Sequence, residues 1–149
     1  FVSPFNAWLL LRGLRTLPIR LKQSAESTQK VLSFLKTHPK IEKVYFPLDP
    51  DFPQYELAKK QMKGASGLLT VAIKAESHAQ IERFTFDLQH FLLAVSWGGH
   101  ESLVLPKCAG LHPDDFDPLQ QEHRLIRFYI GLEEADFLIE DLAQALGKL

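Results

Sequence analysis

Apolar residues recur at helical spacing through the first quarter of the chain. Ser3 followed by Pro4 is typical of a helix start, because a hydroxyl caps free N–H groups and proline fits the first helical position. This helix is predicted to run to about Thr16, and Pro18 then starts a second helix or kinks the first. The second helix carries an apolar stripe that we expect to face the core, formed by Leu17, Leu21, Ala25, Thr28, Leu32 and Leu35.

Further along, short apolar runs bounded by turn residues alternate with helical patterns. Strands are predicted over residues 41–46, 68–73, 92–95 and 126–130, and helices over 54–62, from Ser77 onward and over 135–146. A short element over 101–105 ends at Pro106, and 107–121 is the least regular region. The pattern predicts a two-layer α+β domain, with a small sheet covered on one face by helices. Parallel and antiparallel strand pairing both fit it.

Composition narrows the class of protein. The 149 residues fit one domain, or one domain plus a long connecting helix. A formal net charge of −1 gives no electrostatic footprint for nucleic acid or for an anionic membrane. No apolar run approaches the roughly 20 residues of a membrane span. The chain opens without Met and without a basic leader, so we interpret it as an excised fragment or a processed product. The single cysteine, Cys108, excludes an internal disulfide and fits a cytoplasmic protein.

The most informative chemistry is one arginine in an otherwise apolar strand. Arg127 interrupts the run 126–130, and an unpaired buried charge is costly, so we interpret Arg127 as the partner of an anion. Ser96 and the turn residues Gly98 and Gly99 follow another strand-like run, and together these groups fit a small carboxylate. The alternative is that Arg127 lies on the solvated face of an edge strand.

Other candidate groups carry weaker signals. The six histidines show no ligand spacing with a third partner, so no metal site is expected. Cys108 is expected to be a packed or loop thiol. Glu101 and Ser102 are expected to start a helix after Gly99 and to hold that loop in place.

Several motifs occur together in one order along the chain. They are SPFNAWLLLRGL (3–14), TLP (16–18), SWGGHESL (96–103), IRFYIGLEE (126–134) and a last helix that contains Asp141 and Leu142. This set resembles the carboxyl-terminal part of the trans-sulfuration enzymes, the Cys/Met-metabolism group that uses pyridoxal 5′-phosphate (PLP). The resemblance implies the small domain of the aspartate-aminotransferase-like fold, with about four mainly antiparallel strands. It also implies that residues 1–36 are a long helical connection to a PLP-binding domain outside the chain, and that 37–149 form the substrate-binding domain.

The same resemblance assigns roles to residues. Arg127 would hold the α-carboxylate of an amino-acid substrate, with Ser96 beside that carboxylate. Gly98 and Gly99 would shape the loop. Val95 and Trp97 would tune specificity: several γ-synthases and γ-lyases of the family carry glutamate at the position of Val95. Bacterial cystathionine β-lyases are similar to this chain at Trp97, and methionine γ-lyases are similar to it at Val95 but lack the tryptophan. The alternative for Trp97 is packing under a domain interface.

The function implied is that of a carbon–sulfur lyase of the cystathionine β-lyase type. Alternatives are cystathionine γ-synthase, γ-lyase or O-acetylhomoserine sulfhydrylase activity, or a non-catalytic domain that binds an amino acid. The family's cofactor lysine, in a Ser-x-x-Lys context, and its phosphate-binding residues are not found here, so the isolated chain is expected to be inactive. Residues 107–123 also lack the family's usual Thr-His after the proline, which leaves the role of that loop open. The resemblance further implies a homotetramer built from catalytic dimers.

Overall fold

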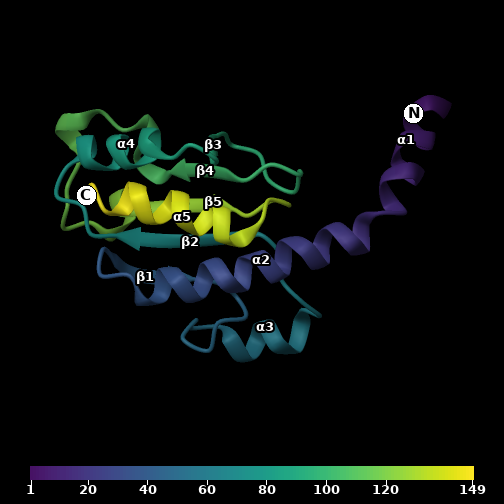
Figure 1. Ribbon diagram of the computed structural model, residues 1–149, viewed down its shortest axis with the longest axis horizontal. Helices are drawn as coiled ribbons and strands as arrows, with labels where there is room; N and C mark the ends of the chain where they lie inside the picture. Colours follow the sequence, from purple (N-terminus) through teal and green to yellow (C-terminus); the bar gives the residue numbers. More distant parts are fainter.

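A computed structural model describes all residues, 1–149, and shows a body of helices on a sheet from which one helix projects (Figure 1). The helices are α1 (Pro4–Leu14), α2 (Leu17–Thr37), α3 (Tyr55–Gln61), α4 (His78–Asp87) and α5 (Ala135–Leu146). The strands are β1 (Ile41–Tyr45), β2 (Leu68–Ile73), β3 (Leu92–Leu93), β4 (Leu103–Pro106) and β5 (Leu125–Tyr129). Three short 3-10 turns occupy most of the region between β4 and β5.

The helix starts follow from local chemistry. The Ser3 hydroxyl accepts the Asn6 N–H at 3.2 Å, and Pro4 is the first residue of α1. The Ser77 hydroxyl accepts the Gln80 N–H at 3.4 Å in front of α4. Both starts were predicted from the sequence, and both are confirmed, because a cap depends only on neighbouring residues.

The sheet has five strands in the order β1-β2-β5-β4-β3. Three of the four pairings are antiparallel, and β3 pairs parallel to β4. The expectation of about four strands was therefore wrong by one strand, β4. Glu101 and Ser102 precede that strand and do not start a helix. The run 103–106 is too short for periodicity to distinguish a strand from another element.

The two faces of the sheet differ in composition. One face is apolar and lies against α2, α4 and α5, where β2, β4 and β5 contribute Leu69, Val71, Ile73, Val104, Ile126 and Phe128 to a core cluster of 21 residues. Side chains alternate along a strand, so the residues between these point to the other face. The predicted α+β class, a sheet with helices on one face, is confirmed.

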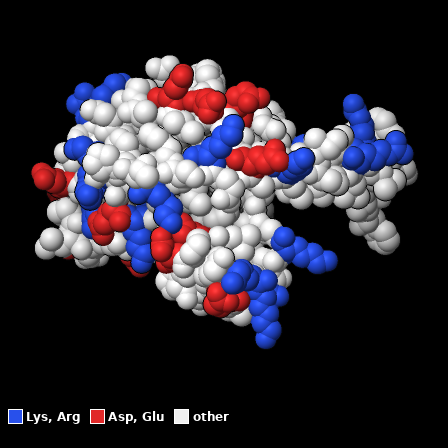
Figure 2. All heavy atoms as spheres, turned by 60° about the horizontal axis from the view of Figure 1, so that its bottom comes forward, with Lys and Arg blue, Asp and Glu red and all other residues white.

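Helix α1 lies apart from this core. None of its residues is buried, and it extends away from the body together with the start of α2 (Figure 1). Figure 2 shows acidic and basic groups interspersed over the body, whereas the protruding end is largely uncharged with a few basic groups. No helix of the chain has the length and apolarity that a membrane crossing requires.

Candidate functional site

Arg127 lies in the middle of the sheet, on the face opposite the helices. It stands across from Thr70 of β2 and from Leu105 of β4. Its neighbours Ile126 and Phe128 are 0% and 1% exposed in the core, so alternation directs Arg127 to the other face. Because β5 is the central strand, the interpretation of Arg127 as an edge-strand residue is wrong.

The loop that follows β3 meets the Arg127 guanidinium. Its Nη2 donates to the backbone carbonyl of Val95 and, at 3.3 Å, to that of Ser96. Its Nε and Nη1 donate to no acceptor of the chain. The fold therefore brings the two sequence motifs together, and it leaves guanidinium donors free for a ligand.

The loop itself adds unsatisfied donors beside this cation. The Ser96 side chain is exposed and its hydroxyl has no partner in the chain. The backbone N–H groups of residues 96–99 also donate to no atom of the chain. A guanidinium flanked by a hydroxyl and free N–H groups binds an anion, and the planar fork of arginine matches a carboxylate through two hydrogen bonds.

Two features shape the loop. Gly98 has a φ of +87°, a left-handed conformation that favours glycine. The Tyr129 hydroxyl donates to the Gly99 carbonyl at 3.1 Å, which ties the loop to β5 two residues beyond Arg127. Tyr129 was not among the predicted site residues, although strand alternation places it on the same face as Arg127.

Val95 and Trp97 are 74% and 64% exposed on either side of Ser96. Trp97 lines a cavity of about 290 Å³ together with Gly98, Gly99 and Tyr129. The opposite wall comes from the start of α2, including Arg20. The indole is thus not packed within this chain, so its exposed surface is available to a ligand or to another domain.

The remaining reactive groups do not join this site. Cys108 is 3% exposed, and burial raises the pKa of its thiol, which keeps it protonated. The chain has no group of three or more His, Cys, Asp or Glu side chains that could hold a metal ion.

The site fits the amino-acid end of a ligand better than a phosphorylated aldehyde cofactor. No lysine lines the cavity beside Trp97, and none bonds the loop or Arg127. An aldehyde cofactor needs an amine to hold it and a cradle of donors for its phosphate, whereas the groups here form one carboxylate-sized cluster. The residues that hold such a cofactor are therefore not those of this site.

Comparison with known proteins decides the family. The model of the Cys/Met metabolism PLP-dependent enzymes matches residues 1–147. The chain belongs to this family. The trans-sulfuration resemblance in the sequence is thereby confirmed, and the cofactor of the family is PLP.

Two named members of the family are similar in sequence to nearly the whole of this chain. Cystathionine gamma-lyase of Macaca fascicularis is 43% identical over 149 residues, which covers 97% of this chain and 36% of that protein. L-methionine gamma-lyase of Porphyromonas gingivalis is 38% identical over 152 residues, which covers 99% of this chain and 38% of that protein. The chain thus spans little more than a third of the length of these relatives.

Solved structures of the family share the fold. Cystathionine gamma synthase of Xanthomonas oryzae, in complex with aminoacrylate and cysteine, superposes with a TM-score of 0.84 at 32% identity, covering 98% of this chain and 38% of that one. A Campylobacter jejuni protein described as an O-acetylhomoserine (thiol)-lyase, which contains a pyridoxyl-lysine phosphate, superposes with a TM-score of 0.81 at 36% identity. That match covers 97% of this chain and 35% of the other.

Proposed function

We propose that this chain is the small, carboxyl-terminal domain of a PLP-dependent carbon–sulfur lyase and that it binds the α-carboxylate of a sulfur-containing amino acid. The observation that carries the proposal is Arg127, a cation on the central strand with free donors and with Ser96 beside it. In this proposal residues 37–149 form the substrate-binding domain, and residues 1–36 connect it to the PLP-binding domain.

The residues of this chain bind and orient the substrate. Arg127 grips the carboxylate through two hydrogen bonds, and one of these replaces the long contact from Nη2 to the Ser96 carbonyl. The Ser96 hydroxyl donates to the same group. Fixing the carboxylate orients the Cα–H bond of the amino acid, which supplies the positional part of catalysis. PLP supplies the electron sink for such chemistry, and in this family it is bound by protein outside this site.

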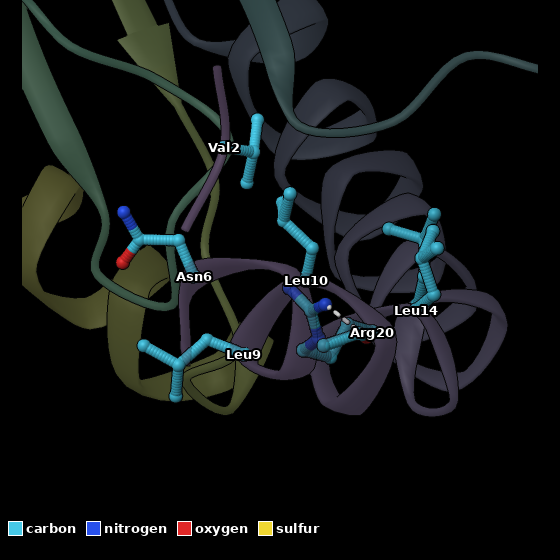
Figure 3. Close-up of a pocket in the computed structure, with 8 residues that line it drawn as sticks. Val2, Asn6, Leu9, Leu10, Leu14 and Arg20 are labelled. Atoms are coloured by element: carbon cyan, nitrogen blue, oxygen red, sulfur yellow. Dashed lines mark hydrogen bonds between the residues drawn. The ribbon is translucent and has the colours of Figure 1, made fainter. Parts of the chain in front are cut away.

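Helix α1 supports the division into domains. Apart from Asn6 and Arg12 its side chains are apolar, and Phe5, Leu10, Leu11 and Leu14 are each 58 to 66% exposed. Figure 3 shows how Leu9, Leu10 and Leu14 lie around an open cavity of about 630 Å³. Arg20 also lines it and donates to the Gly13 carbonyl at 2.9 Å. A helix that is apolar all round belongs in an interior. We assign its cover to the PLP-binding domain.

Limited proteolysis of the complete enzyme tests this assignment. Leu10→Asp together with Leu14→Asp is expected to expose the connection and accelerate cleavage near residues 13–16. Leu57→Asp, at a position 47% exposed on α3, is the matched control and should leave the cleavage rate unchanged. Equal cleavage rates in all three proteins would contradict the assignment.

The bond that is cleaved distinguishes two versions of the lyase. Trp97, in its Ser-Trp-Gly-Gly frame, favours the cystathionine β-lyase type. The named relatives, which are γ-lyases, favour cleavage at the γ-carbon. With L-cystathionine and water, β-elimination yields homocysteine, pyruvate and ammonia, whereas γ-elimination yields cysteine, 2-oxobutyrate and ammonia. Identification of the keto acid distinguishes the two eliminations. A γ-replacement is recognised because it requires a thiol as an additional substrate.

The proposal as a whole is tested on the complete enzyme. Bound PLP should give a visible absorption band, and α-amino acids should change that band, whereas amines that lack the carboxylate should do so only weakly. A complete protein that binds an amino acid through Arg127 but shows no such band would instead be a non-catalytic binding protein.

We further propose that the complete enzyme is a cytoplasmic homotetramer built from catalytic dimers. Light scattering measures its mass in solution.

A further inference from the structure

We infer that Ser102 and Glu133 act as a pair of positioning residues that hold the loop 95–99 over Arg127. This inference rests on the proposed function, because it assigns the two residues a task in binding the substrate carboxylate. Neither residue is assigned a direct contact with the substrate carboxylate. They act through the backbone that carries Ser96.

Ser102 is bonded on every side. It is 0% exposed, and its hydroxyl donates to Oε2 of Glu133 at 2.8 Å and accepts the Gly131 N–H at 2.9 Å. Its own N–H donates to Oε1 of Glu133 at 2.8 Å. The carboxylate of Glu133 therefore grips one residue through two hydrogen bonds, which fixes both the position and the orientation of that residue.

The backbones on either side of this pair are in close contact. The Leu132 N–H donates to the His100 carbonyl at 2.8 Å. A Cβ atom at Gly131 would lie 2.2 Å from the same carbonyl oxygen, so the two segments approach as closely as they do only because residue 131 is glycine. Residues 100–102 thus lie directly against 131–133.

These contacts complete a connection between loop and strand. Gly131 follows Arg127 by four residues, and Ser102 follows Ser96 by six. The loop meets β5 through the bonds from Arg127 to Val95 and Ser96, and through the hydroxyl of Tyr129. The Ser102–Glu133 pair holds residue 102, just beyond the loop, against residues 131–133.

Glu133 is suited to this task and not to proton transfer. Both of its carboxylate oxygens accept hydrogen bonds from Ser102, and no lysine, arginine or histidine pairs with it. Its charge strengthens the two hydrogen bonds instead of neutralising a cation. Both oxygens are thus held by Ser102, which suits a carboxylate that positions a neighbouring segment.

The test uses Ser102→Ala in the complete enzyme. We expect KM for α-amino acids to rise about 10-fold, the equivalent of one hydrogen bond, with a smaller change in kcat. Binding of an amine that lacks the carboxylate should be unchanged. The matched control is Thr85→Val, which removes another buried hydroxyl bond, from Oγ1 to the Ile81 carbonyl at 2.8 Å on α4. It should lower the thermal midpoint without changing KM.

A second variant guards against loss of folding. Glu133→Gln keeps the size and one acceptor, so KM should rise about 3-fold, less than for Ser102→Ala. The inference is overturned if KM is unchanged in both variants, or if Thr85→Val raises KM as much as Ser102→Ala. If Ser102→Ala does not fold, Glu133→Gln alone decides.

Arg127→Lys separates this inference from the proposed function. If Arg127→Lys raises KM while Ser102→Ala and Glu133→Gln do not, this inference fails and the proposed function stands. If Arg127→Lys has no effect, the proposed function itself fails.

Discussion

Phe128 and Arg127 are neighbours in β5, yet they belong to two different regions of the molecule. Phe128 is 1% exposed on the helix-covered face and packs edge to face on Phe84 and Phe91, with ring centroids 6.4 and 5.3 Å away. Arg127 points to the opposite face, where two loop carbonyls bind one of its nitrogens and the others are free. One strand therefore builds the core with one side and the candidate site with the other.

The difference lies in how many partners each residue has within the chain. The core side shares its packing among 21 residues, so the loss of one side chain lowers stability without selecting among ligands. The site side depends on a few directed hydrogen bonds, so the loss of one group should alter binding while the fold persists. Substitutions on the two faces test whether these two consequences stay separate.

The largest effect is expected on the core side. Phe128→Ala should lower the stability of this domain by about 3–5 kcal/mol, because it removes a buried ring and leaves a cavity. Native-state hydrogen exchange of the β5 amides in the complete enzyme measures this change. The control Phe86→Ala, at a ring 73% exposed, should change stability by no more than about 0.5 kcal/mol. A selective loss of carboxylate binding in folded Phe128→Ala would break the separation between the faces.

The counterpart on the site side is Arg127→Lys. Lysine keeps the charge but loses the two hydrogen bonds of the guanidinium. Transition-state stabilisation should therefore weaken by about 2–5 kcal/mol, which lowers kcat/KM about 30-fold to several thousand-fold. The loss should appear for every α-amino acid tested, since all share the carboxylate. An amine without a carboxylate should hardly respond, and the thermal midpoint should hold. Near-normal kcat/KM with a much lower midpoint would make Arg127 a structural residue.

Local rules predicted the elements on both faces of the sheet. The caps at Ser3 and Ser77 and the strand that carries Arg127 depend on nearby residues, and the structure confirms these elements. The short strand β4 and the parallel pairing of β3 were not predicted. Both depend on partners far along the chain, such as the bond from the Leu92 N–H to the Ser102 carbonyl.

The candidate site was predicted only in part for the same reason. Arg127 stood out because a charge in an apolar strand is costly, whereas its closeness to Ser96 was implied by the family resemblance. The Ser102–Glu133 pair joins residues 31 positions apart, and no local spacing indicates such a bond. Strand order also decided that Arg127 is central, which alternation alone does not give.

A smaller effect on the site side concerns Val95, beside Arg127 and 74% exposed. Val95→Glu should improve relative kcat/KM for cystathionine over methionine, because a carboxylate here can accept a hydrogen bond from the distal ammonium. One charge-assisted hydrogen bond is worth roughly 1.5–3 kcal/mol where the geometry fits. The ratio of the two kcat/KM values in both enzymes measures the shift. The neutral isostere Val95→Gln is the control and should shift the ratio less. An unchanged ratio would show that Val95 does not face the distal arm.

The smallest effect is expected at Asp49, a buried charge away from the site. Unlike Arg127, it is paired with a charge of the same chain. Asp49 is 2% exposed, and Lys36 donates to it at 2.9 Å and to Asp51 at 2.7 Å. Burial raises the pKa of Asp49, but the Asp51 N–H and the Lys36 ammonium together outweigh it and hold that pKa below its ordinary value. Its contribution to stability is therefore complete above about pH 4, where an unfolded aspartate is ionised, and is lost as the pH falls through its folded pKa.

Lys36 predicts a loss of stability at high pH, opposite to the loss that Asp49 predicts at low pH. Hydrogen bonds to Asp51 and Asp49 raise its pKa, so its contribution is complete below about pH 10.4 and is lost as the pH rises through the folded value. Asp49→Asn should lower the thermal midpoint at neutral pH by the equivalent of about 1 kcal/mol and should flatten the fall in stability below about pH 4. KM for amino acids should be unchanged, because this charge has its partners within the fold. An equal fall below pH 4 in both proteins would show that Asp49 is not the titrating group, and a changed KM would show that this charge also serves the site.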